Sequence, residues 1–79
     1  MNKSQIIKEM SCILGISQNK TKQIVDLFLN QIAFGLNKDD KVVLSGFGTF
    51  YILEEKANKP PKKRKPRFKV GTDLNSAVN

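Results

Sequence analysis

Apolar residues recur at helical spacing near the start of the chain. One face of a helix would carry Ile6, Ile7, Met10, Ile13 and Leu14. Asn2 is a preferred N-cap residue, and Gln5 is placed after it as a capping box requires. Gly15 is placed to end the helix. The pattern therefore predicts a first helix between Asn2 and Gly15.

A second, longer helix is predicted from Ser17, which can cap its start, to about Leu36. Its main apolar stripe consists of Ile24, Val25, Phe28, Leu29, Ile32 and Leu36. Leu27 and Phe34 fall on a separate face, where they would be exposed in a monomer. Apolar patches of this kind favour a partner surface. Cover by the last helix or the sheet is the alternative, and we favour a dimer contact because so short a chain lacks core.

The second half of the chain has the breaks and spacing of a sheet. After a polar break at residues 37–40, strands are predicted at residues 41–44 and 49–53, joined by a tight turn at Ser45-Gly46. Three prolines keep residues 56–66 out of the middle of a sheet, so we expect an extended arm or projecting ribbon there. The chain returns as a strand at residues 67–70, with Phe68 toward the core and the cations outward.

A short last helix follows, with Leu74 and Val78 pointing inward. The order of elements predicts an α+β fold, with helices first and an antiparallel meander after them. We expect one domain over residues 1–79. Its predicted parts are a helical dimerisation part (1–37), a three-stranded sheet (41–55 and 67–70), a short basic β-arm (56–66) and a C-terminal helix (72–79).

Positive charge is concentrated in one segment. The net charge is +7, and eight of the 14 basic residues lie between positions 56 and 69, where there is no acidic residue. They are Lys56, Lys59, Lys62, Lys63, Arg64, Lys65, Arg67 and Lys69. A nearly neutral body with one cationic segment is typical of a protein that binds a polyanion, so we favour nucleic acid over a solvated loop.

Other classes of function find little support in the residues. There is no histidine, and the single Cys12 excludes an intrachain disulfide, so we predict no metal site, no cofactor and no catalytic residue. An enzyme with a small-molecule substrate is therefore not expected. No apolar run is long enough to span a membrane, and the polar start does not resemble a signal peptide. We expect a cytoplasmic protein without a membrane partner.

A glycine and phenylalanine motif closes the turn and opens the second strand. The motif, Gly46-Phe47-Gly48-Thr49-Phe50, resembles the hallmark of the HU/integration host factor family of bacterial architectural proteins. Further matches in chain order are Met1-Asn2-Lys3-Ser4, Gly15 before a polar cap, Asp40-Lys41-Val42, Phe68-Lys69 before Gly71, then Leu74 and Ala77-Val78. The likeness covers nearly the whole chain apart from the arm.

The resemblance implies an intertwined dimer whose β-ribbon arms embrace the minor groove of double-stranded DNA in the nucleoid. A homodimer, or a heterodimer with another HU-like chain, would meet these expectations. By resemblance, Phe47, Phe50 and Phe68 form the aromatic centre of the dimer core, to which the second helix adds Leu27, Phe28 and Phe34. Lys3 and Gly46 are expected to approach phosphate. Arg64 and Arg67 are the candidates for insertion into the minor groove.

The arm departs from the family pattern. The family's Arg-Asn-Pro tip is absent, residues 58–63 stand in its place, and the arm is shorter than in typical members. Pro60 or Pro61 could wedge between base pairs, or these prolines could only stiffen the segment. Thr72 stands where the family has a cation before the last helix, and Asp73 next to it adds an anion, which weakens the expected phosphate contact there. DNA binding therefore carries over better than sharp DNA bending.

Two other functions stay open at this point. One is an RNA-binding or ribosome-associated module, although single-strand binders usually expose several aromatic residues and only Tyr51 is a candidate here. The other is a shortened family member that pairs with a full-length HU-like chain and modulates it.

The first prediction concerns the basic segment. Neutralising Lys62, Lys63, Arg64 and Lys65 together should weaken duplex DNA binding at least about tenfold at moderate salt, because fewer counterions are then released. A gel shift measures the affinity, and circular dichroism should show an unchanged fold. Unchanged affinity would remove the arm from the mechanism.

Overall fold

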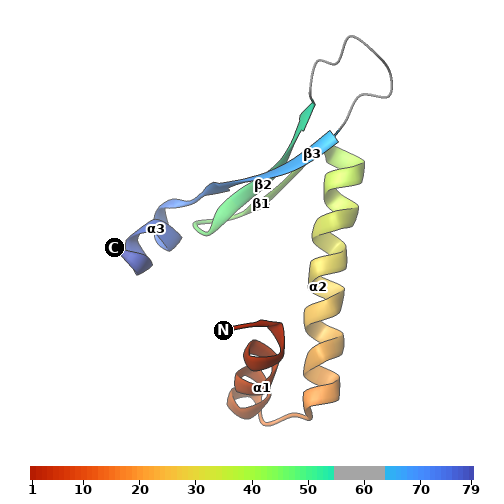
Figure 1. Cartoon of the computed structure of the whole chain (residues 1–79), viewed down its shortest axis with the longest axis vertical. Helices are drawn as coiled ribbons and strands as arrows, with labels where there is room; N and C mark the ends of the chain where they lie inside the picture. The colour runs from red at the N-terminus through yellow and green to blue at the C-terminus, as the bar shows by residue number, and fades with distance from the viewer. Residues whose placement is uncertain (55–63) are drawn as a thin grey trace. The chain divides into compact units, whose positions relative to one another are not determined.

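The computed structural model describes residues 1–54 and 64–79 (Figure 1). The elements are α1 (Lys3–Leu14), α2 (Gln18–Asp39), β1 (Lys41–Leu44), β2 (Gly48–Glu54), β3 (Arg64–Val70) and α3 (Thr72–Val78). This order confirms the predicted α+β fold. Of the predicted arm, Lys56, Lys59, Pro60, Pro61, Lys62 and Lys63 lie outside the described residues. The chain divides into two compact units, Met1–Gln31 and Ile32–Asn79, which we describe separately.

The first unit contains α1 and the first part of α2, and its helix ends follow the predicted signals. Asn2 and Gln5 form a capping box, and Gly15 ends α1 with a left-handed φ of 68°. The Ser17 hydroxyl accepts a hydrogen bond from the Lys20 N–H at 3.1 Å, which caps α2. Thr21 is fully buried, and its hydroxyl donates a hydrogen bond to the Ser17 carbonyl at 2.9 Å. The buried hydroxyl is therefore not left without a partner.

The apolar stripes of the two helices are only partly buried in the single chain. Ile7 and Leu36 are buried, but Ile13 is 83% exposed. On α2, Leu27 is 59%, Phe28 52% and Phe34 61% exposed. In the single chain the stripe of α1 is therefore exposed at Ile13 and Leu14, so the expectation of one core stripe is wrong there. Phe28 is also exposed, and its predicted place in a dimer core stays a prediction.

The helix α2 ends three residues later than predicted. Its last part belongs to the second unit. The sequence predicts a polar break at residues 37–40, but residues 37–39 are helical. A polar last turn remains compatible with a helix when its side chains are exposed. The helix ends where Asp40 takes a left-handed φ of 59°, and the Asp40 N–H donates to the Leu36 carbonyl at 3.1 Å.

Close approach between α2 and β1 explains a glycine in the helix. A Cβ atom on Gly35 would lie 2.7 Å from Cγ2 of Val42. The cost of a glycine inside a helix, about 1 kcal/mol, is thus offset by contact between helix and strand.

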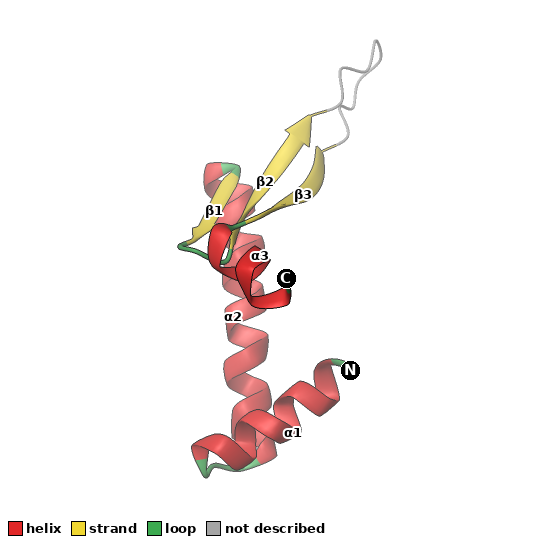
Figure 2. Cartoon of the chain, turned by 90° about the vertical axis from the view of Figure 1, so that its left-hand side faces the viewer, coloured by secondary structure: helices red, strands yellow, loops and turns green. Residues whose placement is uncertain are grey.

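The three strands form an antiparallel sheet with β2 in the middle, shown in yellow in Figure 2. Val42, Phe50 and Phe68 are cross-strand partners in one row. The rings of Phe50 and Phe68 are 4.8 Å apart, and those of Phe47 and Phe68 are 5.9 Å apart. The three rings therefore pack together within one chain, where Phe47 remains 48% and Phe68 38% exposed. Their place in a dimer core stays a prediction.

The strand β3 begins at Arg64, three residues before the predicted start, and includes Pro66. Pro66 pairs with Ile52, whose N–H is donated away from β3, to the Asp40 carbonyl at 3.0 Å. Because adjacent residues of an antiparallel strand alternate in hydrogen-bonding direction, the Pro66 nitrogen faces the free edge. Proline is compatible with a strand at that position, so the arm predicted over residues 56–66 is part of the sheet from Arg64 onward.

The last helix, α3, begins after Gly71. Leu74 is half-buried, as predicted. Val78 is 74% exposed, so the prediction that it points inward is wrong for the single chain. Val78 is the last helical residue, and burial is limited to the part of the helix near Leu74.

The second prediction tests the packing of Gly48. A Cβ atom there would lie 2.3 Å from the Phe68 ring and 2.6 Å from the Lys69 carbonyl oxygen. Gly48→Ala should therefore lower the free energy of unfolding by about 2–3 kcal/mol, through overpacking. Urea unfolding measures the change.

Gly15→Ala is the control for this test. A Cβ atom at Gly15 would meet no atom within 4 Å, and only its positive φ opposes the change, which costs about 1 kcal/mol. If Gly48→Ala costs no more than Gly15→Ala, the close packing described for Gly48 is wrong.

Candidate nucleic-acid interface

The sheet presents cations on the face opposite the aromatic cluster. Along β3, Lys65, Arg67 and Lys69 alternate with Pro66 and Phe68, so the two sets point to opposite faces. All three cations are exposed. The predicted outward orientation is thereby confirmed for Arg67 and Lys69, and Lys65, which was predicted to lie in the arm, shares their face.

The neighbouring strands extend this surface. Arg67 pairs with Tyr51, and Tyr51 pairs with Lys41 on β1, so one cross-strand row reads Lys41, Tyr51, Arg67. Lys69 pairs with Thr49 in the next row. We call this surface the cationic face; its positions are Lys41, Val43, Thr49, Tyr51, Leu53, Lys65, Arg67 and Lys69. None of these eight positions is acidic, so a polyanion meets no like charge on them.

Apolar side chains are interleaved with these cations. Tyr51 is 36%, Leu53 45% and Val43 57% exposed. Such side chains can pack against sugars or bases while lysine and arginine contact phosphate. The arrangement is suited to binding nucleic acid along its backbone.

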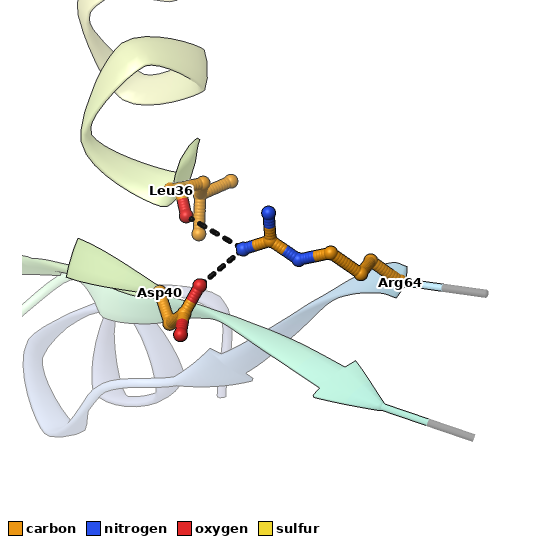
Figure 3. A network of polar contacts seen from close by, with 3 residues as sticks. All are labelled: Leu36, Asp40 and Arg64. Carbon is orange, nitrogen blue, oxygen red and sulfur yellow. Dashed lines mark hydrogen bonds and ion pairs between the residues drawn. The ribbon is translucent and has the colours of Figure 1, made fainter. Parts of the chain in front are cut away.

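Arg64 lies apart from the cationic face. Side chains alternate between the two faces along β3, and Arg64 lies two positions before Pro66. The Arg64 side chain is therefore on the same face as Pro66 and the aromatic residues. Its guanidinium donates to the Asp40 carboxylate and to the Leu36 carbonyl, the latter at 3.4 Å (Figure 3). The predicted insertion of Arg64 into a minor groove would have to break both contacts. Local sequence patterns could not reveal a pair formed across 24 residues.

Lys3 also has an intramolecular partner. Its Nζ lies 2.5 Å from Oδ1 of Asp26 on α2. The hydrogen bond from Lys3 lowers the pKa of Asp26, burial opposes this effect, and the charges of Lys3 and Lys22 reinforce it. The phosphate contact predicted for Lys3 would therefore compete with a carboxylate.

Gly46 holds the turn between β1 and β2 against α3. It has a left-handed φ of 78°, and its carbonyl accepts hydrogen bonds from the N–H groups of Asp73 at 2.8 Å and Leu74 at 3.3 Å. The Gly71 N–H donates to the Phe47 carbonyl at 2.8 Å. These bonds confirm the turn role of Gly46. The carboxylate of Asp73 lies beside it, which disfavours a nearby phosphate.

Other kinds of site were sought among residues 1–54 and 64–79. In these ranges no group of three histidine, cysteine, aspartate or glutamate residues is placed to hold a metal ion. No helix of the described chain has the length and apolar character needed to cross a membrane. Cys12 is a free, exposed thiol on α1.

The whole chain, residues 1–79, matches the family model described as "Bacterial DNA-binding protein". The chain belongs to the HU family. It is 34% identical to the DNA-binding protein HU of Geobacillus stearothermophilus, over 99% of each chain. It is 32% identical to the DNA-binding protein HU-beta of Salmonella typhimurium, over the full length of both.

Solved HU structures have the same fold. HU from Thermotoga maritima matches with a TM-score of 0.78 at 30% identity, over the whole of both chains. An Anabaena HU–DNA cocrystal structure matches with a TM-score of 0.83 at 25% identity, covering 99% of this chain and 97% of that one. These matches confirm the resemblance to the HU family.

This chain is shorter than the HU relative from Geobacillus stearothermophilus. The alignment with the Geobacillus protein spans 89 positions, whereas this chain has 79 residues. The HU relative therefore has residues without a counterpart here. Which residues of this chain contact DNA stays a prediction.

The third prediction concerns the ion pair of Lys3. Lys3→Met should raise the pKa of Asp26 toward its ordinary value of 3.8, because the variant lacks the main hydrogen-bond donor to the carboxylate. Since the folded-state pKa is lowered, the pair stabilises the fold above the ordinary carboxyl pKa. This stabilisation is lost as the pH falls through the folded-state pKa. An NMR titration of the Asp26 carboxyl carbon measures the change.

Lys22→Met is the matched control, because Lys22 acts on Asp26 only through its charge. It should raise the pKa less than Lys3→Met does. An equal rise in both variants would contradict the dominance of the Lys3 hydrogen bond.

Proposed function

We propose that this HU-family chain is an architectural protein that binds double-stranded DNA largely independently of sequence. The proposed interface consists of the cationic face of the sheet together with the basic segment between β2 and β3. The observation that best supports this proposal is that the aromatic residues and the cations lie on opposite faces of the sheet. Phe50 and Phe68 pack together on one face, which leaves the cations on the other face to meet a polyanion.

Counterion release supplies the driving force. Duplex DNA carries one charge per about 1.7 Å of its axis, and bound lysine and arginine displace the condensed counterions. A dimer with two basic segments would make about six to ten phosphate contacts, which corresponds to a log–log salt slope of about −5 to −9. Because such contacts carry no sequence information, discrimination would follow DNA shape and deformability.

Arg67 is the better of the two arginines for contact with a minor groove. It lies on the cationic face, in the row with Lys41 and Tyr51, and a narrow minor groove attracts guanidinium groups. The family match supports the same kind of partner, since a solved relative is an HU–DNA complex. A bacterial nucleoid is the location that fits this function.

A dimer is supported by the apolar surface of α2. Leu27, Phe28 and Phe34 are each more than half exposed. Exposed aromatic and aliphatic side chains in such number favour burial against a second subunit. We propose a homodimer, and a heterodimer with a longer HU-family chain is the alternative that analytical ultracentrifugation of the mixture would detect.

The fourth prediction separates duplex DNA from RNA. Fluorescence anisotropy of a labelled DNA duplex, competed with unlabelled duplex DNA, duplex RNA and single strands, should show duplex DNA as the strongest competitor. Arg67→Gln should weaken binding and make the salt slope less negative by about 0.9 for each phosphate that the variant no longer neutralises. Asn19→Gln, an exposed polar change on α2, should leave both quantities unchanged. Stronger competition by RNA would favour the RNA-binding alternative.

A further inference from the structure

We propose that Asp40 and Arg64 form an ion pair that positions the root of the basic arm, so that Arg64 acts as a positioning residue and does not contact DNA. The arm root means the point where the sheet ends, at the pair Glu54 and Arg64. The inference rests on the proposed function, because it assigns a role within the same interface.

Asp40 connects three elements of the second unit. Its N–H donates to the Leu36 carbonyl at the end of α2, and its carbonyl accepts from the Ile52 N–H of β2 at 3.0 Å. Its carboxylate accepts from Arg64, the first residue of β3 (Figure 3). One residue thus joins the end of the helix to the middle strand and to the start of the returning strand.

Arg64 contributes a second bond to the same place. Its guanidinium donates to the Leu36 carbonyl at 3.4 Å. This carbonyl lies in the last turn of α2 and also accepts the Asp40 N–H. A cation near the C-terminus of a helix is also favoured by the helix dipole. Helix end and carboxylate therefore attract the same guanidinium, and together they fix the start of β3.

The position of this pair determines what it can control. Residues 55–63 connect Glu54 to Arg64 and contain four lysines. Holding Arg64 against α2 fixes one of the two points from which this segment departs. We expect this to favour binding, because Asp40 and Arg64 are already held in place before DNA is bound.

The direction of the side chain argues against a phosphate contact. Arg64 lies on the aromatic face of the sheet, whereas Lys65, Arg67 and Lys69 lie on the cationic face. A phosphate bound on the cationic face would reach Arg64 only after both of its intramolecular bonds had broken. The negative charge of the Asp40 carboxylate also offsets the positive charge of Arg64, which weakens the attraction between Arg64 and a phosphate.

The test compares the salt dependence of duplex DNA binding in single and double variants. Arg64→Gln and Asp40→Asn each remove one member of the pair, and asparagine tolerates the left-handed φ at position 40. Each should weaken binding about threefold to tenfold, since exposed ion pairs are individually weak. The double variant should be no weaker than either single one, and the salt slope of Arg64→Gln should equal that of the unmodified protein.

Two variants serve as charge-matched controls. Asp39→Asn makes the same charge change one residue earlier, at a side chain with no hydrogen bond or ion pair to the described residues; it should bind at least as tightly as the unmodified protein. Arg67→Gln makes the same charge change as Arg64→Gln but on the cationic face, and it should make the salt slope less negative.

The opposite pattern would overturn the inference. If Arg64→Gln changes the salt slope as Arg67→Gln does, while Asp40→Asn binds as tightly as Asp39→Asn, then Arg64 contacts phosphate. Failure of the unmodified protein to bind duplex DNA in dilute salt would instead refute the proposed function. In that case urea unfolding can still test the ion pair. If the effects of Arg64→Gln and Asp40→Asn on the free energy of unfolding simply add in the double variant, the two side chains are not coupled.

Discussion

The alternation of side chains along β3 is the constraint on which the rest of the structure depends. A strand sends successive residues to opposite faces, and here that rule places Phe68 among the aromatic residues while Arg67 and Lys69 face outward. A shift of register by one residue would exchange the two sets. The cross-strand contact of Phe50 with Phe68 therefore also keeps the cations together on one surface.

Local signals in the sequence were sufficient for most of the fold. The capping box at Asn2, the left-handed Gly15 and the hydroxyl cap at Ser17 each depend on residues only a few positions apart, and all three appear as predicted. The predicted boundaries of the strands were less accurate. A proline such as Pro66 indicates the end of a strand unless the direction in which its backbone nitrogen points is known. That direction depends on the hydrogen bond from the Ile52 N–H to the Asp40 carbonyl and on the pairing of Ile52 with Pro66.

The candidate site was only partly predictable for a related reason. Clustered charge identified the basic segment, but the face on which each cation lies depends on strand register. The partners of Lys3 and Arg64 are acidic residues distant in sequence, Asp26 and Asp40. Composition treats all 14 basic residues alike. The fold distinguishes Lys3 and Arg64, which have carboxylate partners, from Arg67 and Lys69, which lie on the cationic face.

Pro66 has a consequence for solubility. In the three-stranded sheet β3 is an outer strand, and outer strands offer unpaired backbone groups on which a foreign strand can add and start aggregation. Pro66 has no N–H to offer along that border, and the flanking Lys65 and Arg67 repel a like-charged strand. The residues that suit this strand to a polyanion thus also discourage the uncontrolled growth of the sheet into fibres.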